Sequence, residues 1–141
     1  SVDGRSGGGL SQQGGNMKLG NSIVAGNGSD CSGTINSLGY NLGQNSTGCT
    51  LTGTLTGNIG GDPQLSPLAS NGGSSQTHAI AFGSPALDAA NNATCATTDQ
   101  RGVARPQDGD GNSTATCDMG AFELEAFTGP TPTPQTCPIR R

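Results

Sequence analysis

The sequence predicts an all-β solenoid, a parallel β-helix in which short strands stack coil on coil. Only 30% of the 141 residues are apolar, which is too few for a thick core. The net charge of −4 lacks the strong charge imbalance of a disordered chain, so a fold with a thin, stacked core is the better prediction. Asn21, Asn41 and Asn58 are spaced by 20 and then 17 residues, close to one coil of a β-helix.

Residues 1–59 are predicted to form the coils. Three similar β-like runs lie at 16–27, 34–45 and 50–62, each bounded by turn-forming residues. Asn tolerates the left-handed conformation that tight corners need, and stacked Asn amides bond to one another along a ladder. The alternative is an irregular Gly/Asn/Ser/Thr-rich linker. Ile23 and Val24, and Leu51 with Leu55, are spaced as strands require, which favours the coils.

Two further regions follow the coils. Residues 60–125 are predicted to form a loop-rich cap on the C-terminal side of the solenoid, and residues 126–141 read as an extended Pro/Thr-rich tail. Residues 1–15 contain neither a helix nor an apolar plug, so we expect an open coil on the N-terminal side. Such a coil would continue into a longer β-helix or dock head-to-tail on another copy.

Five cysteines lack the C-x-x-C spacing of zinc and redox sites, which favours disulfides. The spacing pairs Cys31 with Cys49 and Cys95 with Cys117, and it leaves Cys137 unpaired. The alternative is that all five are reduced and buried. The polar surroundings of these cysteines favour the disulfides.

Seven motifs follow one another between residues 21 and 123: NSIVAGN, DCSGTINSLGYNL, GDPQLSPLASNGG, QTHAI, GSPALDAA, TDQRGVARP and CDMGAFE. Together they resemble the C-terminal region of bacterial surface proteins with a pectin-lyase-like β-helix, the choice-of-anchor Q domain proteins. They are also similar in style to polymorphic outer-membrane proteins. The resemblance implies a right-handed parallel β-helix that is exported and displayed outside the cell. After the tail we find no hydrophobic anchor or sorting motif.

Six charged residues within these motifs are predicted to form a structural network, because the planar forks of the two arginines suit carboxylates and loop carbonyls. They are Asp88, Asp99, Arg101, Arg105, Asp118 and Glu123. A catalytic constellation is the alternative. A polysaccharide enzyme would need ionisable groups on a face of the coils. Between residues 16 and 60 only Lys18 and Asp30 are charged, so we predict no catalytic or cofactor-binding residue.

Three local features have both a chemical and a structural interpretation. His78 beside an apolar pair is expected to be a core residue bonded to backbone. Ser84 lacks the Gly-x-Ser-x-Gly elbow of a nucleophile and reads as a cap before a single helical turn at 85–90. The run containing Asp108, Asp110 and Asn112 resembles half of a calcium loop, although Ser113 and Met119 occupy positions that need Gly and Glu.

Calcium bound weakly at that run is the only cofactor that the sequence suggests. Four Asn-x-Ser/Thr triplets are read as accidents of composition; they begin at Asn27, Asn45, Asn92 and Asn112. The mild acidity, six Lys/Arg residues and absence of a basic cluster argue against nucleic acid and anionic membranes as partners. No apolar run approaches the length of about 18 residues that spans a bilayer.

These observations predict a non-catalytic extracellular or cell-surface protein with a structural or adhesive role, including assembly into fibres. The partners expected are the remainder of a longer β-helix, copies of the same chain, or a cell-surface polysaccharide. The alternative function is the C-terminal part of a secreted polysaccharide lyase or hydrolase whose active face lies on coils outside this chain.

Overall fold

The computed structural model describes residues 8–126, which contain seven β-strands and no helix. The strands are β1 (Leu10–Ser11), β2 (Lys18–Gly20), β3 (Ile23–Val24), β4 (Cys31–Gly39), β5 (Leu42–Gly43), β6 (Cys49–Thr54) and β7 (Ile59–Gly60). All strand pairs are parallel. Short strands joined by Gly- and Asn-rich turns are typical of a solenoid, in which each coil changes direction after a few residues.

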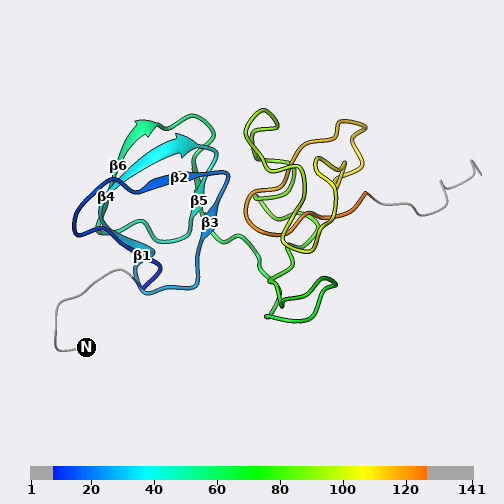
Figure 1. The fold of residues 1–141 in the computed structure, drawn as a ribbon, viewed down its shortest axis with the longest axis horizontal. Helices are drawn as coiled ribbons and strands as arrows, with labels where there is room; N and C mark the ends of the chain where they lie inside the picture. Colours follow the sequence, from blue (N-terminus) through cyan, green and yellow to red (C-terminus); the bar gives the residue numbers. More distant parts are fainter. Residues whose placement is uncertain (1–7, 127–141) are drawn as a thin grey trace, which may run out of the picture.

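The strands stack into about three coils, which confirms the predicted parallel β-helix (Figure 1). Coil 1 carries β1, β2 and β3, coil 2 carries β4 and β5, and coil 3 carries β6 and β7. In one sheet β1 and β2 both pair with the long strand β4, whose other partner is β6. The second sheet has the order β3-β5-β7. Successive coils therefore differ in length, because Ile23 pairs with Leu42, and Leu42 pairs with Ile59.

One corner of the solenoid is built from left-handed residues. The register places Asn21 (φ 50°), Tyr40 (φ 57°) and Gly57 (φ 70°) at equivalent positions of the three coils. A Cβ added to Gly57 would lie 2.5 Å from Tyr40 Cδ1, so this coil requires glycine here. The prediction that Asn21 occupies a tight corner is confirmed.

The asparagine ladder follows one residue later and holds two of the three predicted members. Asn41 Nδ2 donates to Asn58 Oδ1 (3.2 Å) and to the Leu19 carbonyl (3.0 Å), while Asn41 Oδ1 accepts from the Ser22 amide (3.2 Å). Ser22 thus holds the coil 1 position that the sequence spacing assigned to Asn21. The predicted alignment is wrong by one residue there, because coil 1 and coil 2 differ by 19 residues at this corner.

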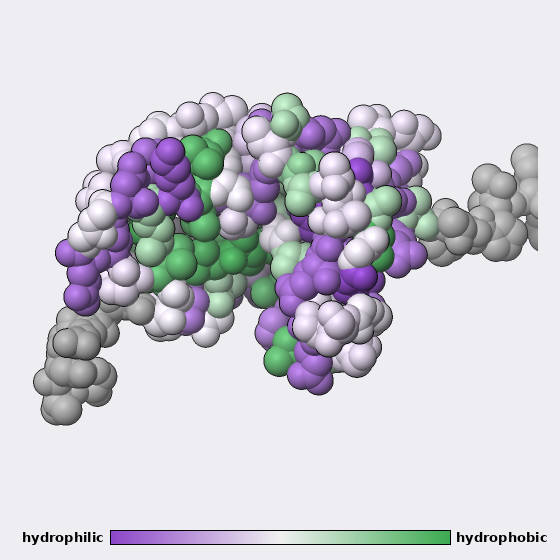
Figure 2. Space-filling model, in the orientation of Figure 1, coloured by the Kyte–Doolittle hydropathy of each residue, from purple (hydrophilic) through white to green (hydrophobic). Residues whose placement is uncertain are grey.

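The solenoid interior is apolar in the middle coil and open at its ends. Ile35 and Leu42 of coil 2 are fully buried, and a small cavity of about 50 Å³ lies between the coils. Their neighbours in coil 3, Leu51 and Ile59, are 39% and 37% exposed, because no further coil covers them among residues 8–126. Figure 2 shows apolar residues gathered on the solenoid half of the molecule.

Residues 61–126 form a second, loop-rich lobe beside the solenoid, which we call the C-terminal lobe (Figure 1). Its only β-pairing is four isolated antiparallel bridges, at Leu65–Ile80, Ala69–Thr77, Thr98–Ala104 and Gln107–Thr116. The lobe's buried apolar residues form one cluster with Leu42 of the solenoid: Ile80, Ala86, Ala90, Cys117, Met119 and Phe122. The two halves therefore share a core.

The helical turn predicted at 85–90 is a short turn over residues 85–88, and no helix forms. The Leu87 amide donates to the Ser84 carbonyl (3.1 Å). Asp88 then adopts φ 49°, which prevents a second turn.

The C-terminal lobe contacts the corner of coil 1. Gly120 N donates to the Asn21 carbonyl (2.8 Å), and Asn91 N donates to Asn21 Oδ1 (2.9 Å). Asn21 Nδ2 donates in turn to Thr94 Oγ1 (3.0 Å). The lobe thus lies beside the solenoid and holds coil 1, a placement that differs from the end cap expected over coil 3.

Candidate functional site

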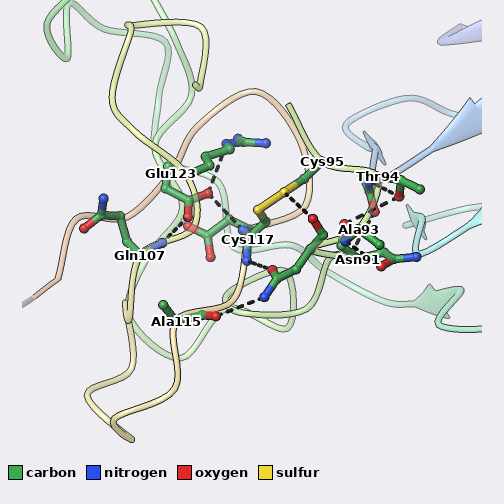
Figure 3. The surroundings of a disulfide bond; sticks show 12 residues. Asn91, Ala93, Thr94, Cys95, Gln107, Ala115, Cys117 and Glu123 are labelled. Carbon is green, nitrogen blue, oxygen red and sulfur yellow. Dashed lines mark hydrogen bonds and ion pairs between the residues drawn. A yellow bond between two sulfur atoms is a disulfide. The ribbon is translucent and has the colours of Figure 1, made fainter. Parts of the chain in front are cut away.

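Both predicted disulfides are present. Cys31–Cys49 joins the first residues of β4 and β6 with a Cα–Cα distance of 5.3 Å, and it therefore ties coil 2 to coil 3. Cys95–Cys117 lies within the C-terminal lobe with a Cα–Cα distance of 6.6 Å (Figure 3). Cys137, predicted to remain unpaired, lies outside the described residues.

Asp99 and Arg101 form a buried ion pair at the centre of the charge network. The side chains are 0% and 7% exposed, and Arg101 Nη2 lies 2.8 Å from Asp99 Oδ2. Arg101 also donates to the carbonyls of Asn71 (3.2 Å) and Glu123 (2.5 Å), and its guanidinium lies 3.7 Å from the centre of the Phe122 ring. One arginine therefore ties three segments of the lobe together.

The carboxylate of Asp99 organises the backbone around it. Its oxygens accept from the amides of Arg101 (2.7 Å), Val103 (3.0 Å) and Glu123 (3.0 Å). Burial by itself would raise the pKa of Asp99, but these amides and the Arg101 guanidinium hold that pKa below its ordinary value. Asp99 is thus charged in the folded protein.

Glu123 is a second buried carboxylate of the network. Its side chain is 0% exposed and accepts from the amides of Gln107 (2.8 Å) and Asp118 (2.9 Å). Arg105 Nε lies 3.0 Å from Glu123 Oε2, although its N–H is not aligned for a hydrogen bond. Arg105 Nη2 donates to the Gly120 carbonyl (2.8 Å). Burial raises the pKa of Glu123 despite these partners.

Asp118 and Asp88 complete the set and bind backbone amides alone. Asp118 accepts from the amides of Asp88 (2.7 Å) and Leu124 (2.5 Å), and burial raises the pKa of Asp118 to about 7. Asp88 accepts from the amides of Asp110 (2.9 Å) and Gly109 (3.4 Å), and burial raises its pKa as well. The six predicted network residues thus lie together and fasten loops of the lobe to one another.

The calcium-like run is arranged differently from the sequence prediction. Carboxylate oxygens of Asp88, Asp108 and Asp110 lie within 4.8 Å of one another. Asn112 is not a member of this group, because its amide oxygen accepts from the Thr114 amide and its nitrogen donates to Asp110. Asp108 also accepts from the amides of Asn112 (3.0 Å) and Ser113 (2.8 Å). The oxygens that a cation would need are thus already hydrogen-bond acceptors.

Two grooves follow the seam between the solenoid and the C-terminal lobe, and His78 lines both. His78 is exposed, so the expectation of a core histidine is wrong, but its Nδ1 lies 2.8 Å from the Ser66 carbonyl, as expected of a backbone partner. The larger of the two, of about 500 Å³, contains one carboxylate, Asp62. The other, of about 290 Å³, is lined by neutral side chains such as Gln76 and Gln100 beside His78.

Ser84 is a buried cap residue, as predicted. Its hydroxyl donates to the Pro63 carbonyl (2.6 Å) and accepts from the Ala86 amide (3.1 Å). A hydroxyl held in this way has no free proton for a base to remove, and it is 5% exposed at the residue level.

Two structurally important polar residues were not singled out as contacts by sequence. Asn21 joins the solenoid to the lobe through both its side chain and its backbone. Asp30 is 1% exposed and accepts from the Asn45 amide (2.5 Å) and from Asn27 Nδ2 (3.3 Å), which closes the turn between coils 2 and 3. An isolated Asp among Gly, Ser and Asn is a weak signal for such a turn.

Comparisons with protein-family models, curated proteins and solved structures gave no match at the thresholds used. Within residues 8–126 no helix is long and apolar enough to cross a membrane. The geometry of the chain itself must therefore support any assignment of function.

Proposed function

We propose that this chain is a non-catalytic structural module of an extracellular or cell-surface β-helix protein. The observation that carries the proposal is the use of its charged side chains. Asp99, Asp118 and Glu123 are buried and bind backbone amides, and Arg101 and Arg105 bind backbone carbonyls and these carboxylates. Side chains committed to such contacts hold the lobe together and are not free to act on a substrate.

The cysteines support the extracellular part of the proposal. Two disulfides within a single small chain are typical of oxidising compartments, because cytosolic thiols are kept reduced. The seven motifs that resemble choice-of-anchor Q proteins support the same location and the same structural role. A rigid solenoid with exposed polar sides suits a stalk or an adhesive surface, whose partner would be a cell-surface polysaccharide or another solenoid.

The catalytic alternative is tested directly with the full chain. The protein is incubated with pectin, polygalacturonate and related polysaccharides, and unsaturated products and new reducing ends are measured. We expect no turnover above a buffer blank, with an authentic lyase as positive control. Turnover that is abolished in a folded His78→Ala or Lys18→Ala protein would refute the structural role, because these residues line a groove and a coil face respectively.

A further inference from the structure

The outer face of coil 3 is an open end of the solenoid, which we call the solenoid end (residues 49–60). β6 pairs only with β4 and β7 only with β5, and among residues 8–126 no strand pairs with their other edges. Residues 50–57 are all exposed. A free strand edge presents unpaired N–H and C=O groups that bind another strand readily.

The side chains of this face are those of an interior. Leu51 stacks on Ile35, and Ile59 stacks on Leu42. The lower residue of each pair is fully buried, whereas Leu51 and Ile59 are 39% and 37% exposed. One more layer on coil 3 would bury them as coil 3 buries the residues of coil 2.

The charge of the solenoid end favours a second copy as that layer. No Asp, Glu, Lys, Arg or His occurs from Cys49 to Gly61. Soluble proteins commonly protect an edge strand with lysine or another charge, and this edge has none. Two identical uncharged faces meet without opposing like charges, which suits a contact of the surface with itself.

Coil 1 is a poorer partner for this face, which bears on the head-to-tail stacking considered from the sequence. The lobe covers the corner of coil 1, where Gly120 N donates to the Asn21 carbonyl. A Cβ added to Gly120 would lie 3.0 Å from Ile23 Cδ1, so the lobe is closely packed against β3. An incoming coil 3 would have to displace this contact.

We propose that two copies of this chain associate through their solenoid ends about a two-fold axis, with the β6 edges antiparallel. A two-fold contact uses the same patch on both partners and therefore closes at a dimer. In it Leu51 and Ile59 of each copy are covered by the other copy. The inference deepens the proposed structural role by naming a partner, and its test reads the oligomeric state, so it can fail independently of the turnover assay.

The test is sedimentation velocity of the full chain over a wide range of concentration. We expect a monomer–dimer equilibrium without larger species. Leu51→Lys and Ile59→Lys should each weaken dimerisation by about a hundredfold or more, because each would bury an unpaired ammonium in the dimer. In the monomer the new side chain can reach water, and circular dichroism checks that each variant is folded.

The matched control is Leu38→Lys, since Leu38 is an equally apolar residue on β4 that is 56% exposed on the side of coil 2. It should leave the dimer intact. A monomer at every concentration, filaments that grow without limit, or a dimer unaffected by both coil 3 variants would each overturn the proposal. A dimer abolished instead by Phe82→Lys would place the contact on the lobe, where Phe82 is 75% exposed, and would also overturn it. Non-reducing electrophoresis identifies a covalent dimer through Cys137, which would do the same.

Discussion

Replacement of Arg101 by alanine is the sharpest perturbation of the charge network. It removes the partner of a carboxylate that is 0% exposed, and it leaves the carbonyls of Asn71 and Glu123 without their donor. Removing one partner of a buried ion pair costs about 3–5 kcal/mol. Three backbone amides continue to bind Asp99 in the variant, so we expect the lower end of that range, about 3 kcal/mol.

The measurement is the free energy of unfolding from urea titrations followed by circular dichroism. Arg101→Ala should lower that free energy by about 3 kcal/mol, a large part of the 5–15 kcal/mol that is typical of a domain. Arg101→Lys should recover part of the loss, because lysine restores the charge without the planar fork. Lys18→Ala is the control, since Lys18 is exposed on β2 and its removal should change stability by about 0.5 kcal/mol or less.

A double-mutant cycle with Asp99→Asn separates the ion pair from the rest of the contacts. If the charge left on Asp99 causes most of the loss, Arg101→Ala should cost much less in the Asp99→Asn background. Equal costs in both backgrounds would mean that the carbonyl contacts and the Phe122 ring account for the role of Arg101. An unchanged free energy of unfolding for Arg101→Ala itself would refute the structural network.

Three further predictions follow from the same contacts. The pKa of Asp118 is raised from 3.8 to about 7, so its favourable contribution is fully present below pH 3.8 and is lost as the pH rises through about 7; Glu123 and Asp88 act in the same direction, and Asp99 in the opposite one. Unfolding measured from pH 4 to pH 8 should therefore show declining stability, and Asp118→Asn should flatten the decline whereas the exposed Asp62→Asn should not. Replacing both cysteines of Cys31–Cys49, or both of Cys95–Cys117, by alanine should lower the free energy of unfolding by about 2–4 kcal/mol; free thiols at these positions in non-reducing peptide maps would contradict the pairing. Asn41→Ala should cost about 1–3 kcal/mol, because the Ser22 amide and the Leu19 carbonyl lose a buried partner, and the exposed Gln13→Ala, measured in the same titration, should cost almost nothing.

The sequence alone determined the features that depend on neighbours along the chain. The recurrence of short apolar runs between Gly and Asn predicted the coils, because a stacked thin core needs only a few apolar residues in each turn. The spacing of Cys31, Cys49, Cys95 and Cys117 predicted both disulfides, since each pair closes a loop of about one coil. The TDQRG and CDMGAFE motifs contained the charged residues that the folded lobe brings together.

Only the tertiary structure decided where the two halves meet. The Asn21 carbonyl binds Gly120, a residue of the last motif, and no periodicity in the sequence encodes a contact between segments so far apart. The same contact leaves coil 3 uncovered, although the sequence predicted a cap there. Register was decided in the same way. A coil length of 19 residues at one corner, and 17 at the next coil, puts Ser22 rather than Asn21 beside Asn41, because side-chain packing and turn geometry set the length of each coil.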